Sequence, residues 1–302
     1  MGRNPLGRNP GLNTAYTNGI RRELAAIGRP QGYVWYVDKN HPNTSDSNDG
    51  LSWERPLTTI GAARTKNNAT IDWADDAYPL NTILVAPGVY AEQIGGLYYV
   101  RLIGTGTRGT DGMAEVSLTG YSALAGTMLN AYIYNMHFEC DTQDTPIVDG
   151  GIVNSTWFER CTFALGANVS GVAGIDTDNS THLTVLNCSF ESGQAQNLAY
   201  GIYARGGANK YLHQARIHYN VIQAATAGIW IQDTCTASGC EIRGNTIYRP
   251  TKGIDDNSGT SYCIDNFISA SSDAIEHANS STQCIGNHVI NNATGAKEAS
   301  ST

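Results

Sequence analysis

A repeated dipeptide marks the positions in this sequence whose side chains could do chemistry. The dipeptide is glycine or alanine followed by isoleucine, and each isoleucine precedes a carboxylate or an aromatic ring: Asp176, Tyr203, Trp230, Asp255 and Glu276. Two positions further along stand Asp178, Arg205, Gln232, Asn257 and Ala278. Carboxyl groups can act as acid, base or nucleophile, and aromatic rings beside amide or guanidinium groups suit the stacking and hydrogen bonding of a sugar chain.

Strand geometry decides which of these side chains could act together. Side chains alternate along a strand, so inward isoleucines would turn both sets of residues outward onto one face. Asp255 and Glu276 would then lie about 5 Å apart on neighbouring strands, and Asp176 and Asp178 about 6.5 Å apart along one strand. Both separations are near those of the carboxyl pairs that cleave glycosidic bonds, so these four are candidate catalytic residues. The candidate ligand-binding residues are Tyr203, Trp230, Arg205 and Gln232.

Two series of recurring residues predict the elements that position these side chains. The first holds the dipeptides, at steps of 27, 27, 25 and 21 residues from Gly174. The second series is Met136, Cys161, Cys188, Asn220, Asn245, Asn266 and Asn287. Repeats of this length indicate stacked units, and short apolar runs broken by turn residues make each unit a coil of strands. We expect the stacked asparagines to hydrogen-bond from coil to coil.

The segment before the repeats carries a family resemblance. We expect a strand from Tyr33 to Val37, a helix from Pro56 to about Lys66, and a strand and Pro-Gly turn over residues 82–94. The residues that carry the resemblance are Tyr36, Val37, Asp38, Asp49, Gly50, Pro56, Thr59, Ile60, Ala62, Ile83, Val85, Pro87, Gly88, Tyr90 and Glu92. From Tyr33 onward the chain resembles the pectate-lyase-like superfamily, which implies an all-β, single-stranded, right-handed parallel β-helix. Similar segments occur in polysaccharide-active enzymes and in virion proteins of phages.

Charge and composition narrow the classes of partner. Residues 1–31 carry a net charge of +4, and the remaining residues carry −12, which gives the −8 of the whole chain. An acidic body argues against nucleic acid as its partner, because phosphate binding needs a basic surface. We expect no membrane span and no signal peptide, since no apolar run is long enough.

The sequence predicts no cofactor and no metal site. Seven cysteines, an odd number, fit reduced thiols, and Cys263 and Cys284 fall in one column. A bridge between Cys235 and Cys240 stays open as an alternative. The seven histidines lack the short spacing of metal ligands.

We expect three regions. Residues 1–32 form a basic arm with a short helix that begins near Asn18, residues 33–292 form the β-helix, and residues 293–302 form a flexible polar tail. The arm could cap the solenoid or anchor it to another protein.

The resemblance, with the basic arm and the missing signal peptide, predicts a structural protein of a phage virion. It would be a spike, fibre or capsid decoration, attached to other virion proteins through residues 1–31 and offering its β-helix to a polysaccharide ligand. The same resemblance implies a homotrimer. The alternative is a polysaccharide depolymerase, either a lyase or a glycoside hydrolase. A solvated face, or a subunit contact through Tyr203 and Trp230, would explain the outward residues without any site.

Overall fold

The structure is a computed structural model. It describes residues 32–71, 73, 80–106, 114–118, 122–140, 144–166, 170–191, 197–257, 259–277 and 281–291. The predicted arm over residues 1–31, the tail over residues 293–302 and Ala278 lie outside the described residues.

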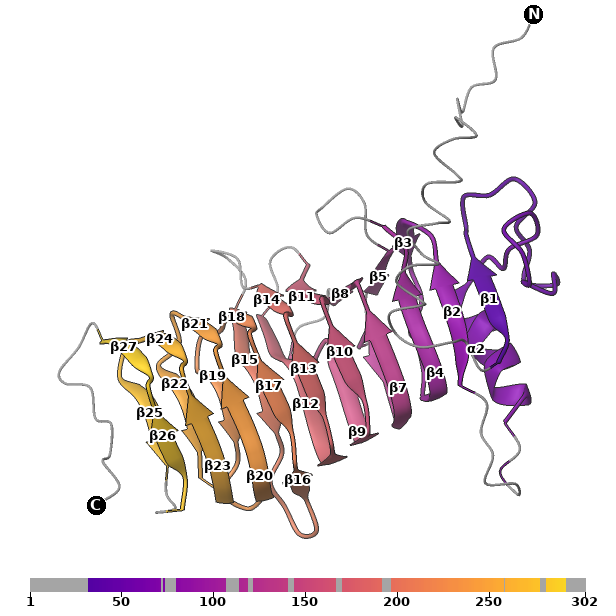
Figure 1. Cartoon of the computed structure of the whole chain (residues 1–302). Coiled ribbons are helices and arrows are strands. Elements are labelled where there is room, and N and C mark those ends of the chain that lie inside the picture. Colours follow the sequence, from indigo (N-terminus) through magenta and orange to yellow (C-terminus); the bar gives the residue numbers. More distant parts are fainter. Residues whose placement is uncertain are drawn as a thin grey trace, which may run out of the picture.

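Parallel strands of successive coils stack into three columns (Figure 1). The first column is β1 (Val34–Val37), β2 (Asn81–Val85), β4 (Leu97–Gly104), β7 (Met128–Tyr134), β10 (Trp157–Glu159), β13 (Thr184–Leu186), β17 (Arg216–His218), β20 (Thr236–Arg243), β23 (Gly259–Ile264) and β26 (Gln283–Ile285). The second column is β6 (Leu124–Ala125), β9 (Val148–Asn154), β12 (Ser170–Thr181), β15 (Asn197–Ala204), β19 (Ala227–Ile231), β22 (Lys252–Asp256) and β25 (Asp273–His277).

The third column is a sheet of its own. It is β3 (Gly88–Tyr90), β5 (Ala114–Leu118), β8 (Met136–Cys140), β11 (Thr162–Leu165), β14 (Ser189–Glu191), β18 (Val221–Gln223), β21 (Thr246–Tyr248), β24 (Phe267–Ala270) and β27 (His288–Asn291). A further short strand, β16 (Tyr211–His213), pairs with the end of β12 on one side and with the start of β20 on the other. The all-β parallel β-helix expected from the repeats is confirmed.

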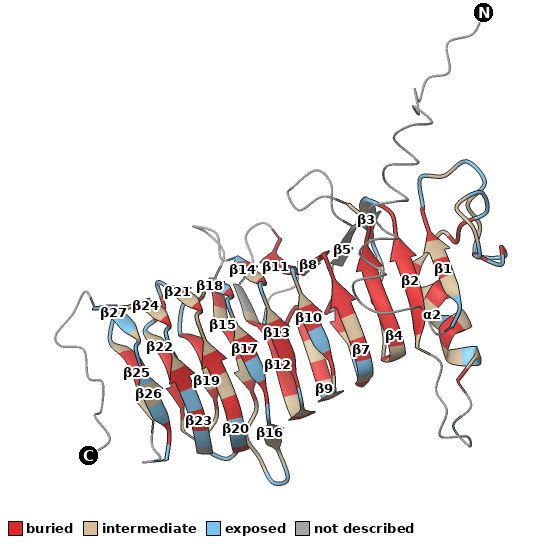
Figure 2. Cartoon of the chain, in the orientation of Figure 1, coloured by how far each residue is buried: buried red, intermediate tan, exposed pale blue. Residues whose placement is uncertain are grey.

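The core fills the space between the columns. The isoleucines of the dipeptides, Ile175, Ile202, Ile229, Ile254 and Ile275, are all buried, as the alternation predicts. The rings of Phe138, Phe163 and Phe190 stack from coil to coil, with centroids 5.8 and 4.7 Å apart. Figure 2 shows buried residues running through the strands from one end of the solenoid to the other.

The glycines of the dipeptides are explained by how closely the coils approach. A Cβ atom on Gly201 would lie 2.3 Å from Cγ2 of Ile222 and 2.7 Å from the carbonyl oxygen of Gly228. The corresponding glycines of the neighbouring coils are equally crowded. The four coils from Gly174 to Gly253 therefore need a residue without a Cβ, because the inner face of the third column presses against it, whereas the last coil has Ala274 at this place.

The asparagine column forms the expected ladder. Asn245 donates from Nδ2 to Oδ1 of Asn266 at 3.0 Å and to the carbonyl of Ile217 at 2.8 Å. Its own Oδ1 accepts from the backbone N–H and the Nδ2 of Asn220, both at 3.0 Å. The ladder satisfies polar groups that are completely buried, since Asn245 and Asn266 are 0% exposed.

A left-handed residue precedes each rung of the ladder and turns the chain from the first column into the third. The φ angles are 53° at Asn187, 55° at Tyr219, 63° at Gly244, 54° at Asp265 and 69° at Gly286. The same corner therefore recurs in each of these coils, which keeps the rungs in line.

The helix lies at the N-terminal end of the solenoid, and its predicted start is wrong. α2 spans Ile60–Ala69, because Leu57 pairs instead with Val37 in an isolated parallel bridge. The side chain of Thr59 caps the helix and accepts from the backbone N–H of Ala62 at 3.0 Å. A carboxylate from the next coil completes the cap, since Glu92 accepts from two further N–H groups of the first turn at 2.7 Å each.

All seven cysteines are free thiols, so no bridge joins Cys235 to Cys240. Cys263 and Cys284 are register partners on β23 and β26, as the column predicts. No helix among the described residues has the length and apolarity needed to cross a bilayer.

Candidate functional site

Strand register aligns the predicted site residues along the second column. The row consists of Asp149, Asp176, Tyr203, Trp230, Asp255 and Glu276, each the register partner of the next on β9, β12, β15, β19, β22 and β25. We call these six residues the outer row. Five of them are the residues predicted from the dipeptides. Asp149 was missed, because it follows Ile147-Val148 and no Gly-Ile pair precedes it.

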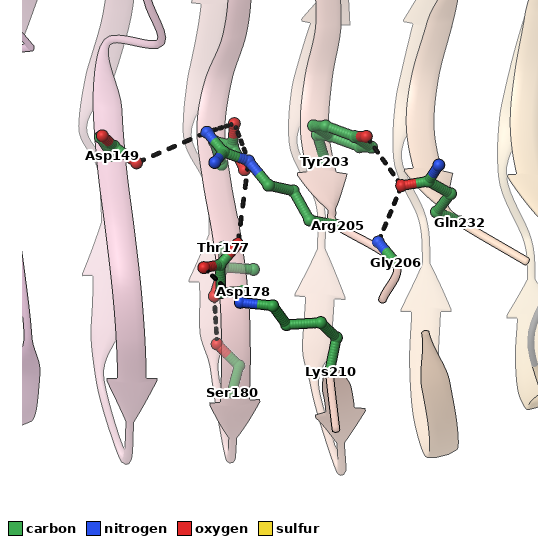
Figure 3. A network of polar contacts seen from close by, with 10 residues as sticks. Asp149, Thr177, Asp178, Ser180, Tyr203, Arg205, Gly206, Lys210 and Gln232 are labelled. Carbon is green, nitrogen blue, oxygen red and sulfur yellow. Dashed lines mark hydrogen bonds and ion pairs between the residues drawn. The ribbon is translucent and has the colours of Figure 1, made fainter. Parts of the chain in front are cut away.

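Asp176 is held by an arginine from the next coil. Arg205 donates to Oδ2 of Asp176 from Nε at 2.8 Å and from Nη2 at 2.6 Å. The same guanidinium lies 3.6 Å from Asp149 and 3.8 Å from Asp178. Figure 3 shows Arg205 reaching back across the strands toward Asp149 and Asp178.

Burial dominates the ionisation of Asp176. The residue points outward, as alternation predicts. It is nevertheless only 1% exposed, whereas alternation alone predicts a side chain open to solvent. Its Oδ1 has no hydrogen-bond partner among the described residues. Burial raises the pKa of Asp176 to about 6, and the hydrogen bonds and charge of Arg205 oppose this rise without cancelling it.

The other candidate carboxylates are also paired with cations. Lys210 lies 2.5 Å from Oδ2 of Asp178. Lys252 lies 2.9 Å from Oδ2 of Asp255 and contacts the carboxylate of Glu276. The predicted pair of Asp255 and Glu276 is therefore adjacent in register, but a lysine side chain contacts both of its members.

Asp255 resembles Asp176 in its surroundings. It is 4% exposed, and its Oδ1 accepts from Nδ2 of Asn257 at 2.5 Å. Burial raises the pKa of Asp255, and the contact with Lys252 acts in the opposite direction. Each buried carboxylate of the outer row is thus balanced by one cation from its own or the next coil.

Two aromatic rings occupy the middle of the outer row, and a third, that of Tyr200, packs against both. The ring centroids of Tyr200, Tyr203 and Trp230 lie 4.7 to 4.9 Å from one another. Tyr200 was missed because its register partners are Ala173 and Ala227, so no aromatic column signals it. All three rings are half-buried, and each covers part of its neighbours.

Two polar nitrogens beside the rings have no hydrogen-bond partner among the described residues. Gln232 accepts through Oε1 from the hydroxyl of Tyr203 at 2.9 Å and from the backbone N–H of Gly206 at 2.8 Å (Figure 3). Its Nε2 has no partner among the described residues. The indole N–H of Trp230 is buried and equally without a partner there. The structure thus brings the four predicted ligand-binding residues together with Asp176 on one face.

Within the ranges that the structure describes, no group of three or more His, Cys, Asp or Glu side chains is arranged to hold a metal ion.

No protein-family model and no curated protein sequence matches the chain. Among solved structures, a rhamnogalacturonan lyase is 14% identical over 79% of this chain and 69% of its own, with a TM-score of 0.45. A pectin methylesterase from Aspergillus niger is 13% identical over 89% of this chain and 92% of its own, with a TM-score of 0.44. A pectin methylesterase from Erwinia chrysanthemi is 14% identical over 78% of this chain and 90% of its own, with a TM-score of 0.33. The assignment of this chain as a parallel β-helix rests on its own strand pairing.

Proposed function

We propose that this protein is a structural component of a phage virion and that its outer row binds a polysaccharide without cleaving it. The observation that carries the glycan-binding part is the unbroken register from Asp149 to Glu276. Six in-register positions extend over about 24 Å at the strand spacing of a sheet. A row of carboxylates and aromatic rings, with the amide of Gln232 beside it, matches an extended polymer with hydroxyl groups on its edges.

The pairing of the carboxylates supports binding rather than catalysis. A glycosidase needs one carboxyl group free to donate a proton and a second free to attack or to activate water. Here Arg205 forms an ion pair with Asp176, and Lys252 contacts both Asp255 and Glu276. These ion pairs hold the side chains in fixed positions, which favours a preorganised binding surface.

The binding test uses glycans extracted from host cell surfaces, with Trp230→Ala and Gln232→Ala compared with wild type. Both variants should bind more weakly, by about ten-fold for the tryptophan, because one loses a ring of the outer row and the other loses the amide beside it. Trp157→Ala is the matched control, since Trp157 is 41% exposed and lies on the first column. Equal binding by wild type and both variants would refute the proposed surface.

The placement in a virion is supported by charge. Residues 1–31 are basic, and the rest of the chain is acidic, so the arm and the body suit different partners. A chain without residues 1–31 should fail to join the particle while the full chain joins. Co-purification of both forms with particles, followed by electron microscopy, tests this.

The proposed homotrimer is tested separately, by light scattering of the full chain. The expected mass is about three times the 32.3 kDa of one chain. A mass near that of one chain would refute the trimer for the isolated protein.

A depolymerase is the second candidate, and the ionisation of Asp176 favours it. A pKa of about 6 is suited to a general acid near neutral pH, and Asp149 lies on the neighbouring strand. If this candidate is correct, the wild type releases reducing ends from the bound glycan and Asp176→Asn releases none. Binding without release, in both proteins, supports the binding function.

A further inference from the structure

We propose that the outer row is specific for polysaccharides that carry no uronate, sulfate or phosphate groups. This inference rests on the proposed glycan binding and adds the class of glycan. The sugar is recognised through its hydrogen-bond donors, which are hydroxyl or ammonium groups, by carboxylates of the protein.

The first argument is that the cations of this face are already used. Arg205 makes two hydrogen bonds to Asp176, Lys210 is paired with Asp178, and Lys252 contacts two carboxylates. An acidic sugar binds best where a cation is free to pair with it. To gain Arg205 or Lys252, the ligand would have to leave the buried carboxylate of Asp176 or Asp255 unpaired, which is strongly unfavourable.

The second argument is that the acceptors of this face are in excess. The side chains of Asp149 and Glu276 are 50% and 43% exposed, at the two ends of the outer row. Between them, Oδ1 of Asp176 is buried and has no partner among the described residues. Hydroxyl and ammonium groups donate to such oxygens, whereas an anionic group cannot.

The third argument is that two donors without a partner near the middle of the outer row are neutral. They are Nε2 of Gln232 and the indole N–H of Trp230, both beside the aromatic cluster. Neutral donors suit the hydroxyl and ring oxygens of a sugar. They give an anion none of the charge pairing that would offset its repulsion from the row.

The net charge of this face also disfavours an acidic polysaccharide. The row and its neighbours contribute five carboxylates, from Asp149, Asp176, Asp178, Asp255 and Glu276, against the three cations. The whole chain, these groups included, carries a net charge of −8. Repulsion of a polyanion should therefore persist along the length of the row and weaken only where salt screens it.

The experiment is an array of oligosaccharides that includes neutral, amine-bearing, uronate-bearing, sulfated and phosphorylated members. The full chain is applied as wild type, Trp230→Ala, Gln232→Ala and Trp157→Ala, at low and at physiological salt. Circular dichroism and thermal unfolding first establish that each variant is folded. Gln232→Ala keeps the test valid if loss of the indole disturbs the fold, because Gln232 is only half-buried.

The expected result is that every array member whose signal falls about ten-fold in the Trp230 or Gln232 variant, and not in the Trp157 variant, lacks acidic groups. Neutral members should bind equally at both salt concentrations, and amine-bearing members should bind more weakly at the higher one. Site-dependent binding of an acidic member would overturn this inference and leave glycan binding intact. If no member binds in a way that depends on Trp230 or Gln232, the proposed binding function itself fails.

Discussion

Arg205 and Asp176 are 29 residues apart in the sequence and joined by two hydrogen bonds, of 2.8 and 2.6 Å. The bond connects β12 to the residue that follows β15, across the gap between adjacent coils. It explains how an outward carboxylate can be almost completely buried, since the guanidinium of the next coil lies against it.

The first prediction concerns the pH dependence of stability at Asp176. The folded state binds its proton more tightly than the unfolded chain does, because the pKa is about 6 instead of 3.8. This contribution to stability is complete below about pH 4 and is lost as the pH rises through about 6. Asp176→Asn does not titrate, so from pH 4 to pH 7 the variant should gain about 2 kcal/mol relative to wild type.

Urea unfolding of both proteins across this pH range measures the difference. A constant difference would mean that the carboxyl group has an ordinary pKa in the folded state. Asp265→Asn is a suitable control, because Asp265 belongs to the corner turns and not to the outer row.

The second prediction concerns the asparagine ladder. Asn245→Ala removes an amide that is completely buried and leaves its partners on both sides without hydrogen bonds, so it should cost about 3 kcal/mol. Asn287→Ala, at the half-buried end of the ladder, should cost less because water can reach the groups it exposes. Chemical unfolding of the two variants checks the order. Equal losses in the free energy of unfolding would show that the contribution of an asparagine to stability does not depend on its burial.

The third prediction concerns the glycines that face the third column. A Cβ on Gly228 would lie 2.4 Å from Cγ2 of Ile247 and 2.7 Å from the carbonyl oxygen of Gly253. Gly228→Ala should therefore lower the free energy of unfolding by about 3 kcal/mol. Gly151→Ala meets no atom within 4 Å and should change it by less than about 0.5 kcal/mol. Similar midpoints for the two variants in a thermal melt would contradict the proposed crowding.

The fourth prediction concerns the cap of α2. Glu92→Gln keeps one acceptor but turns an NH2 group toward a backbone N–H, so it should cost about 1 to 2 kcal/mol. Glu54→Gln, on a fully exposed side chain, should leave the melting temperature unchanged. Loss of helical circular dichroism ahead of the main transition would locate the damage at the helix. An unchanged stability would mean that Thr59 caps the helix alone.

The fold could be predicted from the sequence because each coil repeats the same geometry. Residues such as Ile202 and Ile229 recur at the same place in successive coils, so their spacing in the sequence already gives their register in space. The reason for the glycine before each isoleucine could not be predicted in this way. It depends on how near Ile222 and its equivalents approach from the opposite side of the core.

The candidate site was predicted only in part, since its partners do not recur. Lys210 lies in the connection between β15 and β16, and Lys252 stands at the start of a strand where its register partners are Ala227 and Asp273. Such single contacts leave no periodic signal. Burial of Asp176 was missed for the same reason, because alternation gives the direction of a side chain and not what lies over it.

The asparagine ladder also has a direction. Each rung accepts through its oxygen from the coil before and donates through its nitrogen to the coil after, as Asn245 does between Asn220 and Asn266. An asparagine of the ladder can therefore hydrogen-bond to another asparagine in the coil before it and in the coil after it. A gene duplication that inserted a second copy of residues 221–245 would supply a new asparagine with its donors and acceptors already in place. The length of this molecule can grow by one coil at a time without redesign of the coils on either side.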